Sequence, residues 1–157
     1  MSRMHASAER IVDAEPSSVW SVITDFSGSR PQMLPENYQG YNVERGADGA
    51  GPVLSFTLRA GGRERAYRMQ VEVVTAGQEL FERDLASTYT MRWLVERVGP
   101  GAHTRVRLSS DWESRASGVN GFFERRFAPL GVRRIHQETL VRLGHLMRER
   151  QLAVAGR

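Results

Sequence analysis

Apolar and polar residues alternate along three segments in the middle of the chain, which is the pattern of β-strands with one buried face. The inward side of these segments consists of Tyr67, Met69, Val71 and Val73, then Tyr89, Met91, Trp93 and Val95, then Val106, Leu108, Ser110 and Trp112. Glycine-rich stretches at 46–52, 60–62 and 99–101 mark hairpin turns between these and two further strand-like segments, 38–45 and 53–59. Because short turns join antiparallel neighbours, the sequence predicts an antiparallel meander of about six or seven strands.

The spacing of apolar residues becomes helical from about residue 118 to residue 150. One row consists of Phe123, Phe127 and Leu130, and a second of Val132, Ile135, Thr139, Leu143 and Leu146. Pro129 lies inside this stretch and removes a backbone hydrogen bond, so we expect a kink or a break near residues 128–131. The second helical piece would be roughly 30 Å long, enough to cross a sheet.

A short helix is predicted between a first strand and the meander. Pro16 suits the first turn of a helix, and Val19, Trp20, Ile23 and Phe26 follow at helical spacing. A helix of about ten residues is marginal in water, so its apolar side must pack on the sheet or on a second helix. The whole pattern predicts an α+β fold in which one long helix lies across one curved antiparallel sheet.

The composition favours a single domain over residues 1–157, because the chain is too short for two comfortable ones. It contains no cysteine, which excludes disulfides, thiolate metal ligands and a cysteine nucleophile. All 22 basic residues are arginine, so Schiff-base chemistry on a lysine is excluded too. There is no run of about eighteen apolar residues and no apolar signal-peptide core, so we expect a cytoplasmic protein without membrane insertion.

The net charge of +4 directs attention to Arg125, Arg126, Arg133 and Arg134, which cluster in the predicted long helix. Such a cluster either binds an anionic partner or forms the solvent-facing side of the helix. The arginines alternate with apolar residues and no RNA-binding or helix-turn-helix pattern accompanies them, so we expect no specific nucleic acid partner. The sequence carries no signal of the oligomeric state.

No metal site and no cofactor are predicted. The four histidines lack metal-ligand spacing, and the glycine-rich stretch at 46–51 lacks the spacing of a dinucleotide loop and precedes a strand. Glu79, Glu82 and Asp84 stand close together, but carboxylates at that density are usually solvated, so we expect them on the surface rather than as a catalytic pair.

The order of elements and one motif carry a family resemblance. The motif is Pro-x-x-Val-Trp-x-x-x-x-Asp-Phe at residues 16–26, followed by the short Met33-Leu-Pro35 segment, the meander and the long helix. From about residue 6 to residue 149 the chain resembles the helix-grip START/Bet v 1-like (SRPBCC) superfamily, and within it the bacterial polyketide cyclase/dehydratase and lipid transport group. The resemblance implies a curved seven-stranded antiparallel sheet wrapped round a C-terminal helix, short helices after the first strand, and an apolar cavity between sheet and helix.

Large, adaptable side chains on the inner faces are the candidates to line such a cavity. The predicted ligand-binding residues are Phe56, Tyr67, Met69, Met91, Trp93, Leu108, Ser110, Phe123, Phe127, Ile135, His136, Thr139 and Leu143. Taken singly, each apolar member is more often plain core. The polar members carry more information, since burying a polar group without a partner costs roughly 1 to 3 kcal/mol.

Two functions share this predicted pocket. The first is binding or transport of a hydrophobic small molecule such as a lipid, an isoprenoid or a polyketide. The alternative is a cyclase, aromatase or dehydratase in which His136, a tyrosine such as Tyr67 or Tyr89, and bound water move protons, since histidine titrates near neutral pH. His136 has the competing interpretation of an edge histidine bonded to backbone or carboxylate. A less favoured third function is an interaction protein that uses the arginine-rich helix surface.

The segment 27–37 joins the short helix to the sheet and contains the apolar pair Met33 and Leu34 between helix-breaking residues. It is either a lid over the cavity mouth or a rigid connection whose apolar pair extends the core. A lid predicts mobility that falls when a ligand binds.

Overall fold

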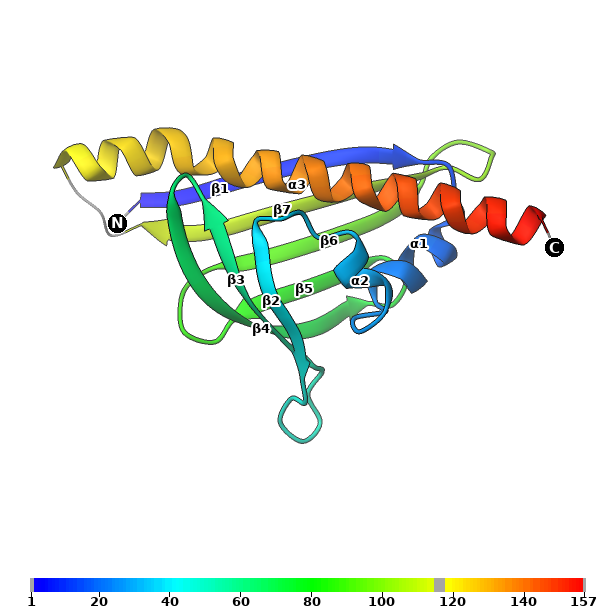
Figure 1. Cartoon of the computed structure of the whole chain (residues 1–157), viewed down its shortest axis with the longest axis horizontal. Helices are drawn as coiled ribbons and strands as arrows, with labels where there is room; N and C mark the ends of the chain where they lie inside the picture. Colours follow the sequence, from blue (N-terminus) through cyan, green and yellow to red (C-terminus); the bar gives the residue numbers. More distant parts are fainter. Residues whose placement is uncertain (1, 115–117, 157) are drawn as a thin grey trace.

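One curved sheet of seven antiparallel strands and a long C-terminal helix make up most of the computed structural model (Figure 1). The structure describes residues 2–114 and 118–156, with the backbone alone for 119–127. The elements in chain order are β1 (Ser2–Val12), α1 (Pro16–Ile23), α2 (Ser29–Gln32), β2 (Tyr38–Glu44), β3 (Val53–Ala60), β4 (Arg63–Thr75), β5 (Glu79–Asp84), β6 (Thr90–Arg97), β7 (Thr104–Ser114) and α3 (Gly118–Ala155). The predicted α+β helix-grip fold is confirmed.

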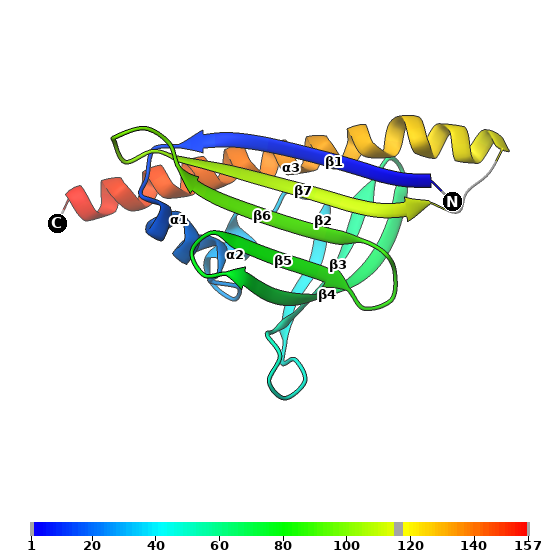
Figure 2. The ribbon, with the colours of Figure 1, turned by 180° about the vertical axis from the view of Figure 1, so that it is seen from behind.

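The strands follow one another through the sheet in the order β1-β7-β6-β5-β4-β3-β2, so every neighbour except β1 and β7 is joined by a local hairpin. In β6, Met91, Trp93 and Val95 are buried while the residues between them are more exposed, as the alternation predicts. The tight β3–β4 turn uses Gly61 and Gly62, both at positive φ, where a side chain would be strained. Seen from behind, the strands bend as one continuous layer (Figure 2).

The short α1 helix begins at Pro16 and packs by its apolar side, as predicted. Val19 and Ile23 are fully buried, and Trp20 packs against the same core. The helix contacts β6 near one end of the sheet (Figure 2). Its eight residues provide too little backbone hydrogen bonding to be stable alone, so this contact is what holds it.

The long helix α3 is continuous from Gly118 to Ala155 with Pro129 inside it, so the predicted break into two helical pieces is wrong, and a kink near residues 128–131 stays a prediction. A proline removes only one backbone donor. The helix packs on β1, β7 and β3. Within the described part of the chain, no helix has an apolar stretch long enough to span a bilayer.

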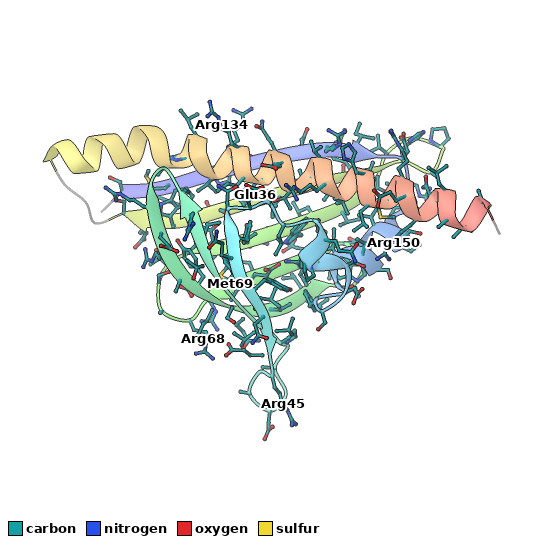
Figure 3. All side chains as sticks on the ribbon, in the orientation of Figure 1. Glu36, Arg45, Arg68, Met69, Arg134 and Arg150 are labelled. Carbon is teal, nitrogen blue, oxygen red and sulfur yellow. The ribbon has the colours of Figure 1, made fainter. Side chains whose placement is uncertain are left out.

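The face of α3 that turns away from the sheet is polar. Arg133 and Arg134 are exposed there, and Arg134 points into solvent in Figure 3. Arg125 and Arg126 lie outside the described side chains. Arg133 and Arg134 therefore lie on the solvent-facing side of the helix, as their alternation with apolar residues predicts.

A buried ion pair joins α2 to the centre of the sheet. The Arg30 guanidinium donates to the Glu82 carboxylate through Nη1 at 3.3 Å and Nη2 at 3.0 Å, and its Nε donates to the Ile23 carbonyl at 3.0 Å. Arg30 also lies over the Trp93 ring, 4.8 Å from its centroid. The side chains of Arg30 and Glu82 are only 3% and 1% exposed.

The carboxylate cluster on β5 therefore differs from the expected solvated surface. Glu82 and Asp84 are buried, whereas Glu79 forms an ion pair with Arg92 in which both side chains are partly exposed. Asp84 accepts a hydrogen bond from the Arg68 backbone N–H at 2.9 Å and another from the Ser87 hydroxyl. The expectation was wrong for Glu82 and Asp84 because each finds buried donors that replace water.

Candidate functional site

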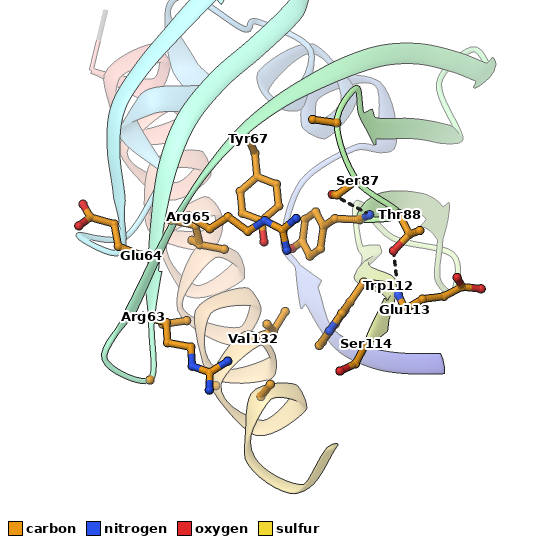
Figure 4. Close-up of a pocket in the computed structure, with 17 residues that line it drawn as sticks. Arg63, Glu64, Arg65, Tyr67, Ser87, Thr88, Trp112, Glu113, Ser114 and Val132 are labelled. Carbon is orange, nitrogen blue, oxygen red and sulfur yellow. Dashed lines mark hydrogen bonds between the residues drawn. The ribbon is translucent and has the colours of Figure 1, made fainter. Parts of the chain in front are cut away.

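A cavity of about 830 Å³ opens between the β3–β4 hairpin, the β5–β6 loop, the end of β7 and the first half of α3 (Figure 4). Its apolar surface includes Leu58, Tyr67, Tyr89, Trp112 and Val132. Polar side chains at its mouth include Arg63, Glu64, Arg65, Ser87, Thr88 and Glu113. The volume lies within the range of about 300 to 1,000 Å³ that is usual for small-molecule sites.

The absence of a side chain on α3 helps to keep this space open. Gly131 lines the cavity, and a Cβ atom at its position would meet no described atom within 4 Å apart from its own turn of helix. Ala128, one turn earlier in α3, also lines the cavity with a small side chain. The helix is therefore narrow where it faces the β3–β4 hairpin.

Aromatic rings form a continuous series across the inner face of the sheet. The centroid distances are 5.0 Å for Tyr38–Phe56, 5.8 Å for Phe56–Tyr67, 4.7 Å for Tyr67–Tyr89 and 5.9 Å for Tyr89–Trp112. These are favourable separations for aromatic pairs, which also lose little conformational freedom on packing. The last three rings of the series form one wall of the cavity.

A buried relay of hydrogen bonds connects this wall to α3. The Tyr89 hydroxyl lies 2.9 Å from Ser110 Oγ, which lies 2.7 Å from His136 Nε2. Ser110 and His136 are fully buried, and Tyr89 is 4% exposed. The other ring nitrogen of His136, Nδ1, has no hydrogen-bond partner in the described part of the chain.

Burial keeps the relay neutral. Loss of solvation lowers the pKa of His136 from its ordinary value of 6.5 to about 4. The same cause raises the pKa of Tyr89 well above its ordinary value of 10.0. Near neutral pH the relay therefore holds an uncharged imidazole and two uncharged hydroxyls.

The cavity mouth carries unbalanced positive charge. Arg63 and Arg65 are exposed, and neither forms an ion pair with any residue that the structure describes, whereas Glu64 between them pairs with Arg59 at 3.1 Å. Arg65 lies over the Tyr67 ring, 5.6 Å from its centroid, so it covers part of the apolar wall (Figure 4).

The structure brings only some of the predicted site residues to the cavity. Tyr67 and Tyr89 line it. Four others, Phe56, Met91, Trp93 and Thr139, border a separate void of about 10 Å³ beside Arg30, which is too small for a ligand. The remaining described ones are buried in the interior, namely Met69, Leu108, Ser110, Ile135, His136 and Leu143. Phe123 and Phe127 lie outside the described side chains.

Several cavity residues were not among the predicted ones. Trp112 stands in the same alternating row as Leu108 and Ser110, so the period of two places it on the inner face. Leu58, Arg63 and Val132 surround the open end of the β3–β4 hairpin, whose distance from α3 no local pattern reveals.

The segment 27–37 contains α2 and is anchored at several points. Met33 is fully buried in the core, Leu34 is half-buried beside the small void, and Arg30 holds Glu82. Arg150 of α3 donates to the Ser29 hydroxyl. These contacts favour the rigid connection over the lid.

Hydrogen exchange at residues 29–34 is expected to be equally slow with and without a bound ligand, because the anchors of this segment lie apart from the large cavity. Exchange measured by mass spectrometry with and without saturating tetralin, a small bicyclic hydrocarbon, checks this. Protection of 29–34 that rises on binding would favour the lid.

A family model and solved structures match the chain. The model described as polyketide cyclase/dehydrase and lipid transport matches residues 3–148. The KanY protein, solved by NMR, is 36% identical over 92% of this chain and 97% of its own, with a TM-score of 0.77. No protein with a curated description matched.

Two more distant structures share the fold. The Zhui aromatase/cyclase from a Streptomyces species is 17% identical, with 95% of this chain and 96% of that chain covered and a TM-score of 0.77. A START superfamily protein from Mycobacterium smegmatis is 20% identical, with 93% and 95% covered and a TM-score of 0.62. The chain therefore belongs to the polyketide cyclase/dehydrase and lipid transport family.

Proposed function

We propose that this protein binds an apolar small molecule in the 830 Å³ cavity, either to hold it or to transport it. The observation that carries the proposal is an open cavity of ligand size walled by Tyr67, Tyr89 and Trp112. Flat aromatic walls suit a planar or unsaturated molecule, which buries apolar area against them. Membership of a family described by polyketide and lipid chemistry supports the same class of ligand.

The alternative is a cyclase, aromatase or dehydratase that acts in the same cavity. The relay from Tyr89 through Ser110 to His136 favours it, because it joins the cavity wall to a histidine, the side chain that most often transfers protons in enzymes. The relay also has a purely structural explanation, since each member satisfies a buried neighbour. Reactive groups are few compared with apolar area, so binding remains the first proposal.

Native mass spectrometry of the protein purified from its own cells tests both functions. A binding protein is expected to carry an additional mass that denaturation releases, and the same molecule is expected on the Tyr89→Phe variant. If the protein is an enzyme that dehydrates or condenses its ligand, Tyr89→Phe is expected to carry the unreacted substrate. That molecule would be heavier by one or more waters than the molecule bound to the wild-type protein. Protein without any bound molecule, together with failure to bind tetralin in solution, would contradict both.

Replacing Gly131 with tryptophan is expected to weaken tetralin binding at least tenfold. The indole projects into the cavity from a position where a Cβ atom meets no other described part of the chain within 4 Å, so it occupies space that the ligand needs. A side chain of this kind presents an area of about 150 to 250 Å². NMR titration of the two proteins measures the change in dissociation constant.

The matched control is Gly131→Ala, which fills almost none of the cavity. It is expected to leave tetralin affinity within about twofold and to raise the free energy of unfolding by about 1 kcal/mol, since glycine is unfavourable inside a helix. Equal affinity of the wild-type and Gly131→Trp proteins would place the ligand elsewhere.

A further inference from the structure

We propose that Ser110 and His136 direct the hydrogen of the Tyr89 hydroxyl into the cavity, so that the cavity selects molecules that present a carbonyl oxygen there. This inference rests on the proposed function, because it specifies the ligand of the same cavity. It is carried by the relay of hydrogen bonds and by the unpartnered nitrogen at its far end.

The direction of the relay is decided at His136. The imidazole is neutral, so one ring nitrogen carries a hydrogen and the other a lone pair. A hydrogen on Nδ1 would bury a donor that has no acceptor among the described residues. A hydrogen on Nε2 leaves Nδ1 with only a lone pair that lacks a donor. In folded proteins a buried N–H without an acceptor is rarer than a buried acceptor without a donor. Nε2 therefore carries the hydrogen and donates it to Ser110 Oγ at 2.7 Å.

The direction then passes through Ser110. A serine hydroxyl has one hydrogen to give. Because Ser110 Oγ accepts from His136, its own hydrogen points to the Tyr89 hydroxyl oxygen at 2.9 Å. Tyr89 is the acceptor of that bond, so its own hydrogen needs a different acceptor.

That acceptor is supplied by the ligand. Tyr89 lines the cavity, with its ring between those of Tyr67 and Trp112, and Ser110 is its hydroxyl's single partner among the described side chains. An O–H group left without an acceptor is unfavourable, so an acceptor atom brought by the ligand gains a bond at this position. A site built to bond one polar atom discriminates against molecules that lack it.

A neutral carbonyl fits this position better than a carboxylate. The rings of Tyr67 and Trp112 flank the Tyr89 ring in the cavity wall, with centroids 4.7 Å and 5.9 Å away. Desolvation of an anion in such surroundings costs far more than that of a carbonyl oxygen. The positive charge of Arg63 and Arg65 lies at the exposed mouth. The ligand inferred here is a largely apolar molecule with an internal ketone.

The first part of the test is the position of the His136 hydrogen. Nitrogen-15 NMR distinguishes a protonated ring nitrogen from one with a lone pair, and His136 is identified by the loss of its signals in His136→Gln. The proposal predicts hydrogen on Nε2 and a lone pair on Nδ1 near neutral pH. The opposite assignment would reverse the relay and overturn the proposal.

The second part compares tetralin with α-tetralone, which differs by a carbonyl in place of one CH₂ group. The affinity for α-tetralone divided by the affinity for tetralin, both measured by NMR titration, is expected to be roughly fivefold lower in Tyr89→Phe than in the wild-type protein. This is the change usual for loss of one hydrogen bond. Taking a ratio within one variant cancels any general loosening of the cavity. Tyr67→Phe is the matched control, since it removes a hydroxyl from the neighbouring ring, and its ratio is expected to stay as in wild type.

The outcomes separate this inference from the proposed function. If tetralin binds but the ratio is unchanged in Tyr89→Phe, the cavity is a binding site and carbonyl selection by Tyr89 is wrong. If the ratio falls equally in Tyr67→Phe, selection does not belong to the relay, which also overturns the proposal. If neither molecule binds, the proposed function and carbonyl selection both fail, and the NMR assignment alone decides the direction of the relay.

Discussion

Glu82→Gln is expected to lower the free energy of unfolding by about 3 to 5 kcal/mol. The substitution leaves the Arg30 guanidinium charged, only 3% exposed, and without the carboxylate that lies 3.0 Å from it. The remaining bond to the Ile23 carbonyl and the Trp93 ring offset only part of that cost. Urea unfolding followed by circular dichroism measures the difference.

Two controls separate the buried charge from the loss of a carboxylate in general. Glu79→Gln removes a carboxylate from the same strand, but its pair with Arg92 is partly exposed, so a change within about 1 kcal/mol is expected. The double substitution Arg30→Met and Glu82→Met removes both charges and is expected to recover most of the stability, because apolar replacements of buried ion pairs are often neutral. Equal losses in Glu82→Gln and Glu79→Gln would contradict a buried pair.

The second large effect is a loss of stability in mild acid caused by His136. Its pKa is about 4 in the folded protein and near 6.5 in the unfolded chain, so the unfolded chain binds more protons between these pH values. The contribution is complete above pH 6.5 and declines as the pH falls towards 4, by about 3 kcal/mol in all.

The matched variant for this prediction is His136→Gln, which keeps a polar side chain of similar reach without the titration. Unfolding curves collected from neutral pH to pH 4 are expected to show a shallower decline for the variant. All carboxylates and the other histidines are common to both proteins, so the difference isolates His136. Parallel pH profiles would mean that His136 is solvated in the folded state.

The fold could be predicted because its signals are local. Alternation along 89–95 and 106–112 gives the inner faces of β6 and β7, and the change to helical spacing near residue 118 gives α3. Pro129 led to a predicted break that α3 does not have, because a proline removes one backbone donor and the helix packs on β1, β7 and β3.

The cavity could be predicted only in part, because its position depends on distances between elements. An apolar row marks the inside of the sheet but does not distinguish filled from open interior. Trp93 and Met91 belong to the filled end, where Arg30 reaches Glu82 across 52 residues of sequence. The open end results from Gly131 on α3 facing the β3–β4 hairpin. The polar hydroxyls of Tyr67 and Tyr89 at the start of apolar rows predict a site on the inner face, and both residues line the cavity.

The most direct test of the central proposal locates a bound apolar molecule by NMR. Intermolecular nuclear Overhauser effects from tetralin are predicted to the methyl groups of Leu58 and Val132, which face the cavity from β3 and α3. Effects confined to Val73 and Val74, which are exposed on β4 away from the cavity residues, or no effects to any methyl group at saturating tetralin, would contradict a ligand site in this cavity.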